Sequence, residues 1–354
     1  MTMLAPEVVE LPAVPQGWTL EQANADRHQA IAAFGFTDRQ ARFLLEVLLH
    51  SGVFLERQYC QFAGIVHGQK TTNFIRNLVD RRLATPITPG KLHRGRMFHL
   101  HYKPLWSAID EADSRFRKRA AQGRMIERVM LLDAVLEARS LRWLGPAGDK
   151  RKHFIRAVGD KLTWLEFPRL RFGDGTKATY RYFPDKLPIG IHPEFGDQPV
   201  FVYLVTRPSP WDFRLFLLRH VALLRVLSHW TIRLLFPKKL VRARHAYLRA
   251  IRDHLVTTLD GRGEMLEKAF RERLQLTDPK LGSPDQRGRQ NDYVAFNGPR
   301  FNALYQQWLV DPQNTIWMAD SRALGVALDR GDGRIECVDL ARQYLHLSPL
   351  VDVA

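Results

Sequence analysis

The sequence predicts a protein of mixed α and β structure (α+β) that begins with a winged helix-turn-helix unit. Three helical segments followed by a two-stranded hairpin, all within about 70 residues, predict that unit. A buried strand over 200–206, followed by a helix that begins at Trp211, predicts a mixed α/β domain after it. Because 354 residues suffice for two or three domains of roughly 100–200 residues each, both units fit in the chain.

The chain divides where composition and pattern change. Residues 1–30 are rich in Pro, Ala and Glu and have no sustained periodicity, so we expect an extended arm. The winged helix is predicted at 31–110, a basic α/β domain at 111–260 and a C-terminal helical and mixed region at 261–354. In this last region we expect a polar loop at 280–300, a helix at 302–309 and strands at 315–318 and 335–338.

The charge of the chain is strongly positive. There are 53 Lys and Arg residues against 37 Asp and Glu, a formal net charge of +16. Such an excess favours polyanionic partners, with nucleic acid before anionic lipid. Cys60 and Cys337 stand in no metal-binding or redox pattern, and Glu7 and Glu10 occupy the place where an export signal carries positive charge. We therefore expect a cytoplasmic protein with no metal and no cofactor.

One apolar segment, 213–236, requires a test for membrane insertion. It contains four Arg and two His residues, and each Arg at a bilayer centre costs on the order of 2.5–3.5 kcal/mol. The segment is therefore predicted to be one long amphipathic helix with a basic stripe. That stripe is either simply solvated or in contact with nucleic acid. The residues concerned are Arg214, Arg219, Arg225 and Arg233, with His220 and His229.

The elements of the winged-helix unit have recognisable ends. Thr37 is a good N-cap for a first helix that stops at Gly52. A turn at 64–68 separates the two later helices, and Pro and Gly residues at 88–96 form the turn of the hairpin. The predicted elements after the first helix are helices at 55–63 and 69–82 and strands at 85–87 and 97–102.

The third helix is predicted to read DNA. In a helix-turn-helix the second helix of the pair enters the major groove, where its outward side chains contact base edges and phosphates. The basic hairpin, or wing, is predicted to contact the phosphate backbone. A winged helix used only for protein contacts is the alternative. The helix residues are Gln69, Lys70, Thr72, Asn73, Arg76 and Asn77, and the wing residues are Lys91, His93, Arg94 and Arg96.

These residues also carry a resemblance to a known family. The run Phe36-Thr37-Asp38-Arg39-Gln40 before a Leu-rich helix, and the recognition helix ending Asn77-Leu78-Val79-Asp80-Arg81-Arg82-Leu83, resemble the N-terminal winged helix of replication-relaxation proteins of plasmids and integrative elements. The resemblance covers about 70 residues and depends on pattern rather than on an invariant motif. It implies that a restriction-endonuclease-like domain follows.

The second domain has the outline of such a nuclease fold. We expect a helix at 124–143, a strand at 180–183 that leads to Pro184-Asp185, and the buried strand at 200–206. An active enzyme of this type needs an acid-x-Lys on the second strand, so that two carboxylates hold a divalent ion and Lys positions the attacking water. The run Val202-Tyr203-Leu204-Val205-Thr206 has neither residue. We therefore predict an inactive relative; Pro184-Asp185 is alternatively a plain turn.

A second candidate for catalysis is His99-Leu100-His101. This pattern places two imidazoles on one face of a strand, as in relaxases that hold a metal beside a nucleophilic Tyr, and Tyr102 is adjacent. The motif is short, and the same residues are explained as the returning strand of the wing. Phosphate contact or a half-exposed strand are the alternatives.

Two runs of basic residues extend the candidate DNA contact. Residues 207–253 contain eleven Lys or Arg against Asp212 and Asp253, and a second cluster follows the winged helix at 115–124. Each run alone is often a solvated face, but together they predict a DNA footprint longer than one domain. The candidate residues are Arg117, Lys118, Arg119, Lys238, Lys239, Arg242 and Arg244.

The features together predict a sequence-specific double-stranded DNA-binding protein, which we expect to be bacterial, cytoplasmic and nucleoid-associated. The resemblance implies transcriptional regulation or the assembly of a replication, mobilisation or transposition complex on a mobile element, with homodimer or partner-protein contacts from the C-terminal part. The first alternative is a metal-dependent nuclease or strand-transfer enzyme that uses Asp185, or His99, His101 and Tyr102. The second is a protein-interaction adaptor, in which the recognition helix would be buried against the C-terminal domain.

Overall fold

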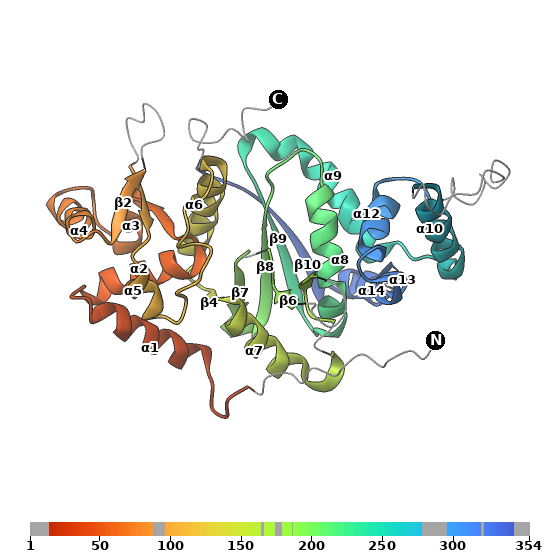
Figure 1. The fold of residues 1–354 in the computed structure, drawn as a ribbon, viewed down its shortest axis with the longest axis horizontal. Coiled ribbons are helices and arrows are strands. Elements are labelled where there is room, and N and C mark those ends of the chain that lie inside the picture. The colour runs from red at the N-terminus through yellow and green to blue at the C-terminus, as the bar shows by residue number, and fades with distance from the viewer. Residues whose placement is uncertain are drawn as a thin grey trace.

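The computed structural model describes residues 14–87, 96–163, 166–173, 179–185, 187–277, 296–319 and 322–342. Over these ranges the protein is a mixed α and β structure (Figure 1). An N-terminal group of helices with a three-stranded sheet lies at one end, a five-stranded sheet lies in the middle, and a group of helices lies at the other end. None of the helices in these ranges is long and apolar enough to cross a membrane.

The N-terminal unit has the order helix, strand, helix, helix, strand, strand after a leading helix. Its sheet is antiparallel throughout, with the strand order β1-β3-β2. Phe43 lies at the centre of the core, where its ring contacts those of Phe54, Tyr59 and Phe74. The elements are α1 (Leu20–Ala32), α2 (Asp38–His50), β1 (Val53–Leu55), α3 (Glu56–Ala63), α4 (Gln69–Asp80), β2 (Ala84–Ile87), β3 (Met97–Leu100) and α5 (Lys103–Ser107).

Local chemistry fixes the ends of these helices. The Thr37 hydroxyl accepts from the Gln40 backbone, and the Gln40 side chain accepts from the Thr37 backbone, which forms a capping box at the start of α2. Gly64 ends α3 with φ +65°, a left-handed conformation that glycine adopts without strain. The predicted helices and strands of this unit are therefore present, each to within a few residues of the expected bounds.

The middle sheet has the strand order β10-β9-β8-β7-β4. Strands β4, β7 and β8 form an antiparallel meander, and β8, β9 and β10 run parallel to one another. Helix α8 makes the crossover between β8 and β9, and its apolar side packs into the main core. The elements are α6 (Gln122–Glu137), β4 (Arg142–Leu144), α7 (Ala147–Val158), β7 (Ile189–His192), β8 (Gln198–Leu204), α8 (Trp211–Val226) and β9 (Trp230–Phe236).

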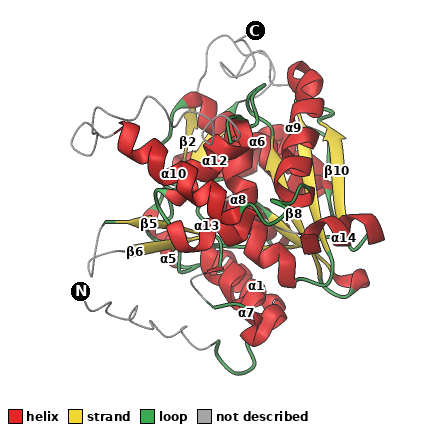
Figure 2. Ribbon diagram, turned by 90° about the vertical axis from the view of Figure 1, so that its right-hand side faces the viewer, coloured by secondary structure: helices red, strands yellow, loops and turns green. Residues whose placement is uncertain are grey.

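Shorter elements and the C-terminal helices complete the fold. The hairpin of β5 (Arg169–Phe172) and β6 (Thr179–Tyr182) forms a separate two-stranded sheet. After β9 the chain forms the 3-10 helix η5 (Lys238–Ala243), α9 (Arg244–Ile251) and the π-helical turn η6 (Arg252–Val256). Figure 2 shows the C-terminal helices on the side that faces the viewer. These are α10 (Gly263–Thr277), α12 (Pro299–Trp308), α13 (Pro312–Ala319) and α14 (Arg322–Arg330), followed by β10 (Gly333–Asp339).

The expected extended arm is wrong for residues 20–30, because α1 covers them. The Thr19 side chain caps this helix, and Arg27 pairs with buried Asp149 of α7 at 2.6 and 3.0 Å. Only Leu20 and Ile31 of α1 are buried, so the segment has no apolar periodicity to reveal it. The helix depends on tertiary contacts instead.

The single long helix predicted at 213–236 is also wrong. Helix α8 ends at Val226, and the interior strand β9, between β10 and β8, begins at Trp230. A strand that is buried on both faces is as apolar as a core helix, so periodicity does not separate the two.

Two further expectations require correction. The helix predicted at 124–143 ends at Glu137, and Trp143 belongs to β4, where its indole N–H donates to the Val135 carbonyl at 3.1 Å. The strand predicted at 315–318 is part of helix α13. Short apolar runs of this kind are ambiguous between helix and strand. The helix near 302–309 and the strand at 335–338 are confirmed as α12 and β10, and β10 lies beside β9 in the middle sheet.

Candidate nucleic-acid interface

Helix α4 presents one apolar and one polar face. Thr71, Phe74, Ile75 and Leu78 are buried against the rest of the unit. Val79 also packs against this core, and the remaining side chains are exposed or partly exposed and include no carboxylate before Asp80. Gly68 precedes the helix without a side-chain cap, so the first backbone N–H groups lie at an uncapped helix start. Among the predicted residues, Gln69, Lys70, Asn73 and Arg76 are exposed, and Thr72 and Asn77 are partly exposed.

A groove runs between this polar face and the first turn of α2. Its lining includes Arg39, Lys70, Asn73 and Asn77. The Arg39 guanidinium donates to the Ala63 carbonyl at 3.0 Å, which holds it at the end of α3. Two cations and three amides, the third being Gln40, therefore line one depression between α2 and α4, together with the Asp38 carboxylate. Arg39 was not among the residues predicted from sequence, although its place in the first turn of α2 could have indicated it.

The base of the predicted wing is held by an ion pair. Arg96 precedes β3, lies 2.8 Å from the Glu56 carboxylate and stacks near the Phe98 ring. About two thirds of the Arg96 side chain is exposed. The other predicted wing residues, Lys91, His93 and Arg94, lie outside the described residues.

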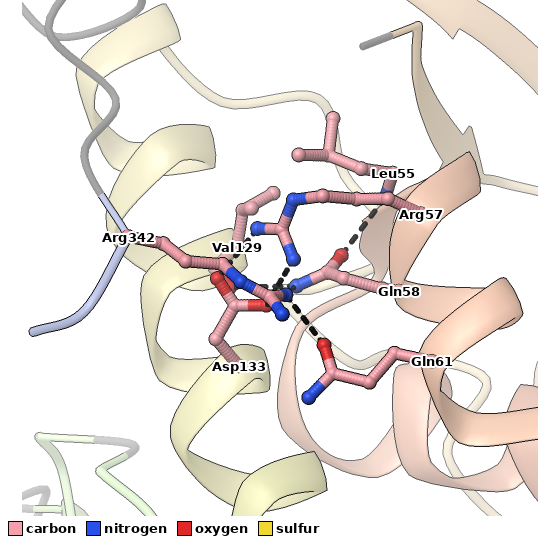
Figure 3. A network of polar contacts seen from close by, with 7 residues as sticks. All are labelled: Leu55, Arg57, Gln58, Gln61, Val129, Asp133 and Arg342. Atoms are coloured by element: carbon pink, nitrogen blue, oxygen red, sulfur yellow. Dashed lines mark hydrogen bonds and ion pairs between the residues drawn. The ribbon is translucent and has the colours of Figure 1, made fainter. Parts of the chain in front are cut away.

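A buried polar network anchors the helix pair formed by α3 and α4 to the rest of the protein (Figure 3). Asp133 of α6 is almost fully buried and accepts from Arg57 at 2.9 and 2.7 Å and from the Gln58 amide at 2.8 Å. Gln58 also accepts from the Leu55 backbone and donates to the Val129 carbonyl. Because Arg57 and Gln58 belong to α3, the network fixes the orientation of α3 and of the α4 that packs on it.

The network was not predicted from the sequence. A single Asp inside the apolar run of α6 was the available indication, because a buried carboxylate requires partners. Arg342, which follows β10, joins the same network through the side chain of Gln61 and approaches Asp133 at 3.9 Å. The chain after the last strand is thereby attached to α3.

The basic cluster after the winged-helix unit is exposed only in part. Arg117 donates to the Ala112 carbonyl at 2.7 Å and is partly buried, whereas Lys118 and Arg119 are exposed. The backbone of this segment lies against β3, where the Phe116 carbonyl is 3.1 Å from the His99 imidazole. Lys118 and Arg119 therefore stay available for phosphate contact, and Arg117 has a structural partner.

The histidine pair does not form an open metal site. His99 is buried and its ring nitrogen is engaged by the Phe116 carbonyl, and burial lowers the pKa of its imidazole. The His101 ring lies 6.2 Å from that of His99, and about a third of Tyr102 is exposed. Among the described residues, no group of three or more His, Cys, Asp or Glu side chains is placed to hold a metal ion.

The Asp185 carboxylate is paired with an arginine. Arg219 of α8 donates to both carboxylate oxygens, at 2.6 and 3.3 Å. The strand that leads to Asp185 is β6, which pairs with β5 and lies outside the five-stranded sheet that contains β8. Val202, Tyr203 and Leu204 on β8 are buried apolar or aromatic residues. The arrangement gives the nuclease alternative no support.

Most cations of 207–253 have internal partners. Arg214 pairs with Asp253 and Arg233 with Glu336, while the Arg225 guanidinium stacks on Trp317 at 3.9 Å. Arg214 is only 3 % exposed, so the predicted solvated stripe of α8 does not exist. Arg244 pairs with Asp339 at 2.6 Å, whereas Lys238, Lys239 and Arg242 are exposed.

Comparisons with protein-family models, with curated proteins and with solved structures found no match for this chain. The resemblance to replication-relaxation proteins stays a prediction from the sequence.

Proposed function

We propose that the protein binds double-stranded DNA through the outward face of α4. The observation that carries the proposal is the exposed set of amide and cationic side chains on α4, namely Gln69, Lys70, Asn73 and Arg76. Amides bind adenine and guanidinium groups bind guanine in the major groove, and both also bind phosphate.

The element order supports a winged helix as the scaffold for this contact. Helix, strand, helix, helix, strand and strand follow one another from α2 to β3, with the strand order β1-β3-β2. In such a unit α3 and α4 form the helix-turn-helix, and α4 enters the groove. The adaptor alternative requires this helix to be buried against the C-terminal domain, yet its polar face is exposed.

We infer a role in DNA-directed regulation or complex assembly rather than in cleavage. The basic net charge and the exposed Lys118 and Arg119 support a footprint that extends beyond α4. The resemblance to replication-relaxation proteins adds plasmids or integrative elements as the setting. Transcriptional control and the assembly of a replication, mobilisation or transposition complex are the two forms of this proposal.

The test is equilibrium binding of the full chain to duplex pools across a salt series, with Mg²⁺ present. We expect intact DNA, tighter binding to a subset of sequences, and weaker binding as salt rises. Arg76→Ala should weaken binding to a preferred duplex by about 1–3 kcal/mol and relax its sequence preference. Arg171→Ala, an exposed arginine on the separate β5–β6 hairpin, is the matched control. Absence of binding at low salt would overturn the proposal, and cut DNA would restore the nuclease alternative.

A further inference from the structure

A row of basic side chains, four of Lys or Arg and one of His, follows the helical segment from η5 to the π-helical turn. Steps of three and four residues separate Arg242, His245, Arg249 and Arg252, which places these four near one face of α9 and its flanks, and Lys238 begins the 3-10 helix that precedes them. All five side chains are exposed. We call this set the α9 row; it consists of Lys238, Arg242, His245, Arg249 and Arg252.

The charge of the α9 row is not neutralised within the described parts of the chain. The neighbouring carboxylates are already used: Asp253 pairs with Arg214, Asp339 with Arg244, and Asp212 lies 3.6 Å from Arg207. In the portion of the protein that the structure describes, the α9 row has no ion-pair or hydrogen-bond partner for its side chains. The row spans 15 residues, or about 24 Å at about 2.0 Å per residue in the 3-10 helix and about 1.5 Å per residue after it.

The opposite face of the same segment is fixed in the core. Tyr247 is 2 % exposed, packs against Tyr203, Phe213 and Phe236, and donates to the Arg207 carbonyl at 2.9 Å. An amphipathic helix binds a membrane by inserting its apolar face, and here that face is already buried. The partner that fits is therefore a rigid polyanion that lies along the row.

The α9 row is also tied to the helix pair that carries α4. Asp339 pairs with Arg244 at the start of α9, and Arg342, three residues later, joins Gln61 of α3. Three residues of chain span at most about 11 Å. In Figures 1 and 2, β2, α6 and α9 all lie along the upper edge of the molecule. Helix α9 and the N-terminal unit are therefore joined by a short segment that is anchored at both ends.

We propose that the α9 row binds the phosphate backbone of the same duplex that α4 reads, in the DNA that flanks the α4 site. This inference rests on the proposed function. It makes the natural ligand a duplex longer than the site of one winged helix, because duplex DNA offers one negative charge per about 1.7 Å along such a row.

The experiment compares two lengths of duplex with the full chain. One is about 30 base pairs long and is enriched from a random pool by the unaltered protein; the other is its central core of about 12 base pairs, about 41 Å long. The variant K238A/R242A should bind the long duplex at least about 10-fold more weakly, and its salt slope should fall by about 1.8, because each lost phosphate contact removes about 0.9. Binding to the short core should be unchanged.

The matched control is K161A/R171A, which removes two exposed cations away from the α9 row. Equal affinities and slopes of the two double variants on the long duplex would overturn the inference, as would an equal loss on both lengths. The inference would also be overturned if K238A/R242A bound vesicles of anionic lipid more weakly than the unaltered chain but bound the long duplex equally well. Failure of the proposed function is distinguishable, because then Arg76→Ala would leave binding to the short core unchanged.

Discussion

Helices α4 and α8 both carry polar and cationic residues, and they use them in opposite ways. The polar side chains of α4 face outward, whereas Arg214, Arg219 and His220 of α8 face inward or bind neighbouring carboxylates. The two helices have a similar density of positive charge, with two Lys or Arg among 12 residues in α4 and three Arg among 16 in α8. Positive charge in a sequence therefore indicates an exposed surface only where the register of the helix places that charge outside the core.

The largest effect is expected at the anchor that orients the α4 helix pair. Asp133→Ala leaves Arg57 and Gln58 without their buried acceptor and should lower the free energy of unfolding by about 3 kcal/mol. Urea unfolding of the full chain measures it. Asp160→Ala, at an exposed position after α7, is the control and should change little. A loss no larger than that of the control would show that α4 does not depend on this network.

The inward cations of α8 are expected to act through stability alone. Arg219→Ala should destabilise the fold by about 2 kcal/mol, less than a fully buried pair, because a quarter of the Asp185 side chain is exposed. DNA affinity of the folded protein should stay within about two-fold of the unaltered chain. A large loss of DNA binding at unchanged stability would contradict the assignment of the α8 cations to stability and of the α4 side chains to DNA binding.

A pH effect should separate the buried imidazole of α8 from the exposed residues. Burial lowers the pKa of His220 to about 4, so the unfolded chain, with a pKa near 6.5, binds more protons. Stability from this group is complete above pH 6.5 and is lost as pH falls toward 4, by about 2 kcal/mol between pH 8 and pH 5. His220→Phe keeps the ring contacts with Phe201 and Phe216 and should flatten the profile by that amount. An unchanged profile would place the titration elsewhere.

The smallest change in stability is expected on the outward face. Arg76 is exposed, and Arg76→Ala should alter the free energy of unfolding by less than about 0.5 kcal/mol while it weakens DNA binding. Urea unfolding and duplex titration of the same preparation measure both quantities. Destabilisation by more than 1 kcal/mol would mean that Arg76 holds the fold.

The N-terminal unit was largely predictable because its signals are local. The capping residue Thr37, the helix-ending Gly64 and the apolar spacing of α4 each determine a nearby element. The outward residues of α4 followed from the same spacing. Helix α1 was missed because its main anchor, the pair of Arg27 with Asp149, joins positions far apart in the chain.

The middle sheet was less predictable for the same physical reason. Strand β9 is buried between two parallel neighbours, so its apolar run continues that of α8 without a change of period. The partners of Arg219 and of Asp133 come from distant segments and leave no local pattern. The spacing of the α9 row is visible in the sequence. Its unpaired charge is not, because that depends on the pairing of the nearby carboxylates Asp253 and Asp339 with Arg214 and Arg244.

The most direct test of the account is lysine acetylation footprinting of the full chain, with and without a bound duplex. Lys70 on α4 and Lys161 after α7 are both exposed, so both should react in the free protein. We expect the bound duplex to protect Lys70 from acetylation and to leave Lys161 reactive. Equal reactivity of Lys70 in the free and the bound protein, under conditions where the duplex is fully bound, would contradict the claim that the outward face of α4 contacts DNA.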